Sequence, residues 1–132
     1  MDTKLTVEIV TPEKRVLTAQ AEEVVIPGAE GLFGVRPGHT PYLALLRAGT
    51  LTVRDGQDRA WFIPGGFAEV SADKVVVLAD RAEPVPEIDV AAAQQRLDEA
   101  QAKLPTVTPE EARVLRAKVD LERARLNAAA GR

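Results

Sequence analysis

The chain contains 132 residues, of which 45% are hydrophobic and 28% charged, and its formal net charge at pH 7 is −3. This length predicts one small domain with an appendage, and the balance of apolar and charged residues is that of a folded globular protein. The weak negative charge and an aromatic content of 4% argue against the basic or base-stacking surfaces of nucleic-acid-binding proteins. No apolar run approaches the roughly 18 residues that a membrane-spanning helix needs.

The supply of reactive side chains is small. The sequence has no cysteine, one histidine (His39) and one serine (Ser71). A Ser–His–Asp triad would need both, yet Ser71 lies in a turn-like segment without the strained elbow of a nucleophile. A lone histidine without a carboxylate cluster makes a poor metal site. We therefore expect a non-enzyme with no catalytic residues, metal or cofactor, in a cytosolic-type compartment.

Short strands are predicted from the start of the chain to residue 83. Leu5, Val7 and Ile9 recur at every second position, which is the period of a strand with one buried face. Asp55-Gly56 between two β-prone runs predicts a hairpin. The other candidate strands are residues 16–17, 22–26, 42–46, 51–53, 59–63, 67–70 and 74–78. Many short strands with no helical pattern between them predict an antiparallel β-sandwich or barrel.

Three features of this region carry specific expectations. Residues 42–46 are continuously apolar, which predicts a strand buried on both faces. Gly65-Gly66 is predicted to form a turn between two strands. Trp61 lies in an apolar strand and is expected to be buried, which argues against a carbohydrate site.

The character of the sequence changes at residues 84–86, where two prolines flank one residue and make a stiff, non-helical joint. Two helical segments follow it and are separated by a short loop that contains Pro105. Such a connection predicts two antiparallel helices. We therefore expect a β domain over residues 1–86 and an α-helical hairpin over residues 87–132.

The ends of both helices are marked by capping signals. Asp89 can cap the first helix, whose apolar residues recur every three or four positions until Pro105 ends it. Residues 108–111 form a capping box with proline at the first helical position, and the second helix is predicted to run to about Ala130.

The second helix carries two apolar stripes on roughly opposite sides. One stripe consists of Ala112, Leu115, Val119 and Leu126, and the other of Val114, Ala117, Leu121, Ala124 and Ala128. A hairpin needs only one of them. Either the alanines merely favour the helix, or this helix packs against two different neighbours.

Charge is segregated along the chain. Residues 109–132 hold six basic and four acidic side chains, whereas residues 1–88 hold nine basic and thirteen acidic ones. The second helix is therefore net positive, which weakly indicates an acidic partner surface.

Residues 26–41 are the most distinctive segment. Its glycines permit tight turns, but no Gly-Lys-Ser/Thr follows and it is not a phosphate-binding loop. On composition alone it is a turn-rich loop with a surface histidine. The motifs within it are Pro27-Gly28-Ala29-Glu30-Gly31 and Gly34-Val35-Arg36-Pro37-Gly38-His39-Thr40-Pro41.

These motifs, with Gly65-Gly66-Phe67-Ala68-Glu69-Val70 and Glu122-Arg123-Ala124-Arg125, resemble the epsilon subunit of F-type ATP synthases. The resemblance covers essentially the whole chain in order and implies a β-sandwich followed by a two-helix hairpin. It also implies a rotor-stalk subunit that helps couple proton- or sodium-driven rotation of the c-ring to ATP synthesis. The implied partners are the gamma subunit, the c-ring and the alpha/beta catalytic head, and the chain would be associated with the membrane only through the complex. Its implied place is the cytoplasmic face of the bacterial plasma membrane, or the stromal equivalent if photosynthetic.

The resemblance assigns roles to several residues. It places the c-ring contact on Glu30, Gly31, Leu32 and the loop that reaches His39. The hairpin would fold against the sandwich or extend into the head and restrain ATP hydrolysis. The basic side chains that would meet acidic surface in the extended state are Arg113, Arg116, Lys118, Arg123 and Arg125.

Some members of the resembled family bind ATP in the hairpin. Of that motif this chain keeps Glu83, Ile88 and Asp89, but Ala92 and Glu99 stand where arginines are expected. Because a triphosphate needs cationic donors, the resemblance implies a remnant site with weak or absent ATP binding. The alternative reading of the whole chain is a free-standing β-sandwich binding module with a helical oligomerisation tail.

Overall fold

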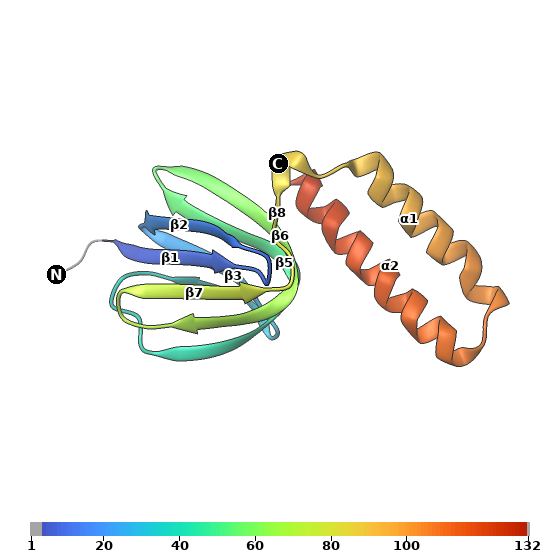
Figure 1. The fold of residues 1–132 in the computed structure, drawn as a ribbon, viewed down its shortest axis with the longest axis horizontal. Helices are drawn as coiled ribbons and strands as arrows, with labels where there is room; N and C mark the ends of the chain where they lie inside the picture. The colour runs from blue at the N-terminus through green and yellow to red at the C-terminus, as the bar shows by residue number, and fades with distance from the viewer. Residues whose placement is uncertain (1–3, 132) are drawn as a thin grey trace. The chain divides into compact units, whose positions relative to one another are not determined.

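The computed structural model describes residues 4–131, and the chain divides into two compact units between Pro84 and Val85. The first unit is a β-sandwich and the second a pair of antiparallel helices (Figure 1). This architecture confirms the predicted fold class. The boundary expected after residue 86 falls inside a short 3-10 helix, Val85–Glu87, that opens the second unit.

The sandwich consists of eight strands in one sheet that folds over itself. Its order is β2-β1-β7-β6-β5-β3-β4, and β8 pairs with β6. The strands are β1 (Leu5–Val10), β2 (Arg15–Ala21), β3 (Glu23–Gly28), β4 (Gly31–Val35), β5 (Tyr42–Asp55), β6 (Gln57–Val70), β7 (Lys74–Ala79) and β8 (Glu83–Pro84). All pairs are antiparallel except that of β1 with β7, which is parallel and was not predicted.

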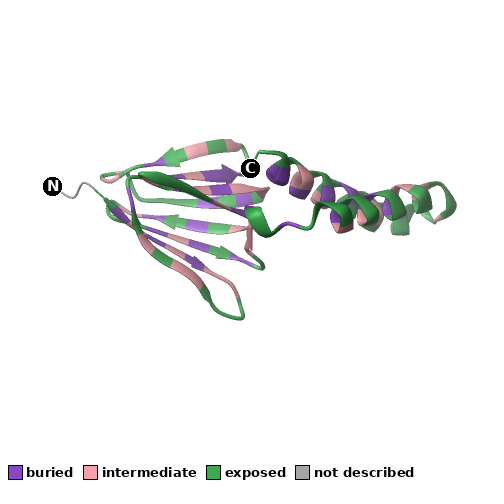
Figure 2. Cartoon of the chain, turned by 90° about the horizontal axis from the view of Figure 1, so that it is seen from above, coloured by how far each residue is buried: buried purple, intermediate pink, exposed green. Residues whose placement is uncertain are grey.

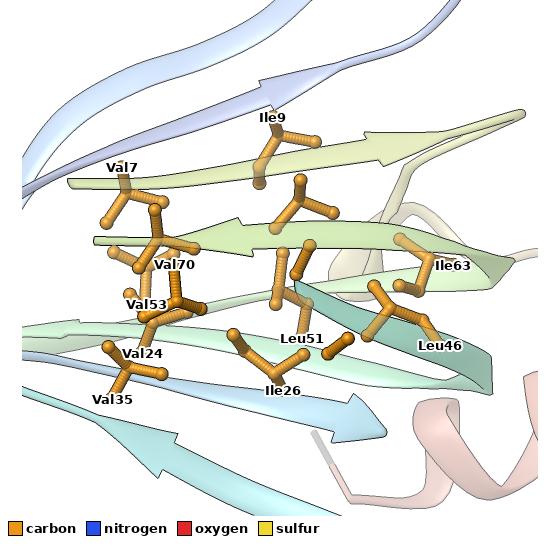
Figure 3. Close-up of a cluster of buried hydrophobic side chains, with 14 of the residues drawn as sticks. Val7, Ile9, Val24, Ile26, Val35, Leu46, Leu51, Val53, Ile63 and Val70 are labelled. Atoms are coloured by element: carbon orange, nitrogen blue, oxygen red, sulfur yellow. The ribbon is translucent and has the colours of Figure 1, made fainter. Parts of the chain in front are cut away.

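The core of the sandwich is built from the inward-facing side chains of alternating strand positions (Figure 3). Leu5, Val7 and Ile9 of β1 are fully buried, as the period-two pattern predicts. Trp61 is 8% exposed, which confirms its predicted burial. The other large, fully buried side chains in this unit include Val24, Ile26, Val35, Leu51, Val53, Phe62, Ile63, Val75 and Val77.

The long hairpin of β5 and β6 corrects two sequence predictions. The two strands pair from Tyr42↔Val70 to Asp55↔Gln57 and turn at Gly56, as predicted. The expected turn at Gly65-Gly66 is wrong, because both glycines lie inside β6. Gly66 has a φ of +141°, and a Cβ there would lie 2.1 Å from the carbonyl oxygen of Leu78. Glycine is therefore required by a close approach of β6 to β7.

The prediction that residues 42–46 are buried on both faces is also wrong. Ala44 and Leu46 are buried, but Leu43 is 65% and Leu45 58% exposed. A continuous apolar run does not distinguish a doubly buried strand from a strand with one apolar face left open.

The second unit begins with the 3-10 helix and continues with α1 (Val90–Lys103), a 3-10 turn (Leu104–Thr106) and α2 (Pro109–Ala130). The capping predictions are confirmed: Asp89 Oδ1 accepts a hydrogen bond from Ala92 N at 3.0 Å, and Thr108 Oγ1 accepts one from Glu111 N at 3.3 Å. The helix pair shares a small apolar cluster of Leu97, Ala100 and Val119, with Leu104, Leu115 and Leu126 partly buried around it. Much of the helical surface is exposed (Figure 2).

Candidate interaction surfaces

An apolar row crosses the outer face of the sandwich. Because directly paired residues of neighbouring strands point to the same side of a sheet, the register places four of them in line. Leu45 pairs with Phe67, Phe67 with Leu78, and Leu78 with Val10. The exposed fractions are 58% for Leu45, 50% for Phe67 and 45% for Leu78. At the usual strand spacing the row is about 14 Å long, and a shallow hollow lies beside Phe67 and Leu78.

A second row lies two positions farther along the strands. It contains Leu43, Glu69, Val76 and Glu8, in register across β5, β6, β7 and β1. Glu8 pairs with Lys74 at 3.5 Å. Together the two rows form an apolar face with acidic side chains along one border, which we call the sandwich face. Contiguous exposed apolar side chains of this kind mark an interaction surface in soluble proteins.

The predicted c-ring residues lie at two different places. Glu30 belongs to the two-residue turn between β3 and β4, and Leu32, 65% exposed, follows it at the start of β4. His39 lies beyond the other end of β4, in the loop of residues 36–41. Since the five residues of β4 span about 13 Å, the structure brings Glu30, Gly31 and Leu32 together and separates them from His39.

The loop that carries His39 is tied to the sandwich at several points. Gly38, with a φ of +87°, donates its N–H to the carbonyl oxygen of Ala72 at 2.6 Å. His39 Nδ1 lies 2.7 Å from the carbonyl oxygen of Thr40. Arg36 donates from Nε to Glu23 Oε2 at 3.2 Å. The contacts of Gly38 and Arg36 fix the loop to the sandwich, and the first of them places it beside the turn that contains Ser71.

Glu23 is the anionic partner of two arginines. Its carboxylate accepts hydrogen bonds from Arg36 and, at 3.1 Å, from Arg54 Nη1, and these bonds hold its pKa below the usual value. A Cβ on Gly34 would lie 2.9 Å from Glu23 Oε2. The glycine of the Gly-Val-Arg motif thus leaves room for the carboxylate that anchors the motif's arginine.

The five basic residues predicted on the second helix do not share one environment. Arg113, Arg116, Lys118 and Arg123 are exposed. Arg125 is only 8% exposed and donates to Glu122. In this structure four of the five cations are therefore exposed, and the fifth is buried.

Glu122 joins the two helices. Glu122 is 3% exposed. Its carboxylate accepts two hydrogen bonds from Arg96 of α1, from Nε at 2.9 Å and from Nη2 at 3.3 Å. It accepts a third from Arg125, which lies one turn farther along α2. Burial raises the pKa of Glu122, but the hydrogen bonds and charges of the two arginines outweigh burial and leave the pKa below its usual value. Sequence analysis missed this cluster. The available signal was a glutamate at the position between Val119 and Leu126 on an otherwise apolar stripe.

The second stripe of α2 is largely outside the helix pair's apolar cluster. Val114 is 70% exposed and Ala117 is exposed, whereas Ala128 is buried. The further neighbour of α2 therefore stays a prediction, and Val114 is the most exposed apolar side chain available to it.

Two residues of the remnant nucleotide motif, Ile88 and Asp89, have structural roles in the chain. Asp89 caps α1 through its contact with Ala92, and Ile88 is 4% exposed. Within residues 4–131 no group of three or more histidine, cysteine or acidic side chains is arranged to hold a metal ion.

Comparisons with known proteins identify the family. Residues 4–85 match the family described as "ATP synthase, Delta/Epsilon chain, beta-sandwich domain". The ATP synthase epsilon chain of Myxococcus xanthus is 54% identical over 129 residues, which cover 96% of this chain and 95% of that protein. The chain belongs to the ATP synthase epsilon-chain family. An epsilon chain is a non-catalytic subunit of the central stalk, so the expectation of a non-enzyme is confirmed.

Other comparisons agree with this assignment. The epsilon chain of Syntrophobacter fumaroxidans is 45% identical over 94% of this chain and 92% of its own length. A chain in the structure of the Euglena gracilis mitochondrial ATP synthase shares the fold with a TM-score of 0.88, at 24% identity over all of this chain and 84% of that one. A chain from the Tetrahymena thermophila enzyme has a TM-score of 0.68 at 18% identity, with 96% of both chains covered. This protein is a subunit of a membrane-bound complex, and none of its described helices is long and apolar enough to span a membrane.

Proposed function

We propose that this subunit couples ion-driven rotation of the c-ring to ATP synthesis by bridging the ring and the gamma subunit. Two observations support the proposal. The chain aligns with the Myxococcus xanthus epsilon chain along almost the whole length of both, and its sandwich presents an apolar face that a soluble monomer would not leave open. The structural neighbours come from assemblies described as containing a c-ring.

The sandwich face is the proposed gamma-binding surface, and the β3–β4 turn is the proposed ring contact. Glu30, Gly31 and Leu32 form a compact, exposed tip that suits the second role. His39 lies at the far end of β4 from this tip. We therefore assign its loop to a separate part of the interface.

The hairpin is the proposed regulatory element, which restrains ATP hydrolysis when it reaches the alpha/beta head. The exposed cations Arg113, Arg116, Lys118 and Arg123 would meet acidic surface there. The hairpin works without bound ATP, since Ala92 and Glu99 cannot supply the cationic donors that a triphosphate needs. The proposed place of the complex, and of this subunit with it, is the cytoplasmic face of the bacterial plasma membrane, and the match to bacterial epsilon chains supports this proposal.

Co-purification of the assembled complex tests the two surfaces separately. Phe67→Ser removes the centre of the apolar row, and we expect this variant to co-purify with neither the gamma subunit nor the c-ring. Leu32→Ser removes an equally exposed apolar side chain from the β3–β4 turn. It should retain gamma and lose only coupling, measured as proton pumping per ATP hydrolysed. Retention of Phe67→Ser at the wild-type level would contradict the gamma assignment.

The family assignment replaces the alternative of a free-standing binding module. The matched relatives are epsilon chains over both the sandwich and the helical region. Self-association of the isolated chain through its helices is therefore not expected.

A further inference from the structure

We propose that Glu69 is the counter-ion for a basic side chain of the gamma subunit, an arginine or a lysine, which enters a shallow hollow at the acidic border of the sandwich face. This role for Glu69 rests on the function proposed above, because it takes the sandwich face as the surface that gamma covers. The gamma surface must then be apolar over much of the contact and carry a cation opposite Glu69.

The hollow lies beside the second row of the sandwich face. Glu69 is exposed and lies in register between Leu43 of β5 and Val76 of β7. Phe67, two positions earlier in β6, points to the same side of the sheet. Apolar side chains thus flank Glu69 on three sides. On the side away from Phe67, the hollow is lined by Pro41, Tyr42, Val70, Ser71 and Lys74.

Glu69 has no ionic partner within the described residues. No lysine, arginine or histidine nitrogen of residues 4–131 lies at ion-pair distance from its carboxylate. The cation that lines the hollow is Lys74, and its Nζ lies 3.5 Å from Glu8 Oε1. Because Glu8 offsets the charge of Lys74, these two anions and one cation leave a net charge of −1 at the hollow. In the uncovered chain, water solvates the Glu69 carboxylate.

A partner that covers the sandwich face removes this water. A carboxylate that loses its water without gaining a partner is strongly unfavourable, and the flanking Leu43, Phe67 and Val76 have no hydrogen-bond donors to offer from their side chains. The partner must therefore supply the cation. An arginine or lysine suits the hollow, because its aliphatic stem packs on apolar side chains while its charged end reaches the acid.

The position of the hollow favours gamma as the occupant. Leu43, Glu69 and Val76 line the hollow and also belong to the sandwich face, so a partner that covers the face reaches the hollow. The proposed ring contact in the β3–β4 turn contributes no lining residue. A second copy of this chain would bring its exposed Arg47 as the cation instead, and the experiment below separates the two occupants.

Binding of the full-length chain to ATP synthase depleted of this subunit tests the role of Glu69. The complex is immobilised, and association and dissociation rates are measured for wild type, Glu69→Gln, Glu69→Lys and Asp73→Asn. Asp73 is an exposed acid in the turn between β6 and β7 and does not line the hollow, so this control removes the same charge. Phe67→Ser serves as the reference for loss of the apolar row. Thermal unfolding followed by Trp61 fluorescence checks that each variant is folded.

We expect Glu69→Gln to bind about tenfold more weakly than wild type, because it leaves the gamma cation covered without its counter-ion. Most of this loss should lie in the dissociation rate, since the ion pair exists only in the complex. Glu69→Lys brings two like charges together and should bind at least about a hundredfold more weakly. Asp73→Asn should change the affinity by less than about twofold, and only through the association rate.

Charge reversal in gamma identifies the partner residue. Each exposed lysine and arginine of gamma is changed to glutamate in turn, and the resulting complexes are tested with Glu69→Lys. We expect one of these complexes to bind Glu69→Lys within about tenfold of the wild-type affinity and to bind the wild-type chain poorly. Such a reciprocal pair places the two side chains in direct contact, which a purely structural role of Glu69 does not produce.

Three results would overturn the role of Glu69. The first is an affinity of Glu69→Gln equal to that of Asp73→Asn, and the second is that no gamma reversal restores the binding of Glu69→Lys. The third is a dimer of the free chain in sedimentation that Glu69→Gln dissociates, which would assign the hollow to a second copy. If Phe67→Ser fails to bind in the same experiments, the gamma assignment of the face still stands. Wild-type binding of Phe67→Ser would contradict that assignment, and the role of Glu69 with it.

Discussion

The sandwich and the hairpin are stabilised by different kinds of contact. The sandwich buries a continuous apolar cluster with many large side chains, and its ion pairs, such as Glu23–Arg36, lie at the surface. The hairpin has a small cluster of leucine, alanine and valine, and an ion cluster of Arg96, Glu122 and Arg125 joins its two helices. Large apolar burial stabilises the sandwich, whereas the smaller apolar cluster contributes less to holding the two helices together. The difference is consistent with the roles proposed above, a coupling element in the sandwich and a regulatory element in the hairpin.

The largest effect should come from the core of the sandwich. Leu51 is fully buried, and Leu51→Ala should lower the free energy of unfolding by about 2–5 kcal/mol because it leaves a cavity in a close-packed interior. The matched control is Leu45→Ala, the same change in the same strand at a side chain that is 58% exposed on the outer face of the sandwich. It should cost far less. Urea denaturation followed by the fluorescence of Trp61, the only tryptophan and a core residue, measures both.

A comparable loss in the two variants would contradict the comparison, because the exposed Leu45 would then contribute as much to folding as the buried Leu51. It would also remove the reason to regard the exposed apolar row as reserved for a partner.

Acid should weaken the hairpin before the sandwich. The pKa of Glu122 is held below its usual value in the folded chain. Its contribution to stability is therefore full above the unfolded pKa, about 4.3 for a glutamate, and is lost as the pH falls through the lower folded pKa. Glu23 has a lowered pKa as well, but its loss leaves the apolar core of the sandwich intact.

Hydrogen exchange between pH 3 and pH 6, corrected for the intrinsic pH dependence of exchange, checks this order of events. We expect protection of α1 and α2 to fall below about pH 4.3 while that of β5 and β6 persists. Glu122→Gln has no titrating group at this position, so its hairpin should show a flatter profile. Simultaneous loss of protection in both units would contradict the contrast between them.

Sequence alone predicts those features whose signal is local. The period of two in β1, the Asp55-Gly56 hairpin and the caps at Asp89 and Thr108 each depend on neighbours within a few residues, and the structure confirms them. The parallel pairing of β1 with β7 depends on contacts about 70 residues apart, for which a single sequence carries no comparable signal.

The candidate surfaces show the same limit. The apolar row exists because Val10, Leu45, Phe67 and Leu78 come into register across four strands. No local pattern distinguishes their exposed face from the buried one, which is why residues 42–46 were assigned to the interior. The Arg96–Glu122 contact likewise depends on how the two helices meet. The resemblance implied a ring contact for the β3–β4 turn together with His39, and it gave no sign that the two lie apart.

The smallest effect on folding should come from removing the hairpin. A chain that ends at residue 88 keeps β8, whose pairing with β6 joins Pro84 to Trp61 and Glu83 to Phe62. The sandwich core is built from residues of the first unit. We therefore expect the unfolding midpoint reported by Trp61 to change little, and the truncated chain to assemble with the rest of the complex.

ATP hydrolysis by that complex should rise, because the proposed restraint has been removed. An unchanged hydrolysis rate with normal assembly would reject the regulatory role of the hairpin and leave the coupling role of the sandwich standing. A large fall in the midpoint would instead show that the two units depend on each other for stability, and the comparison between them would then have to be redrawn.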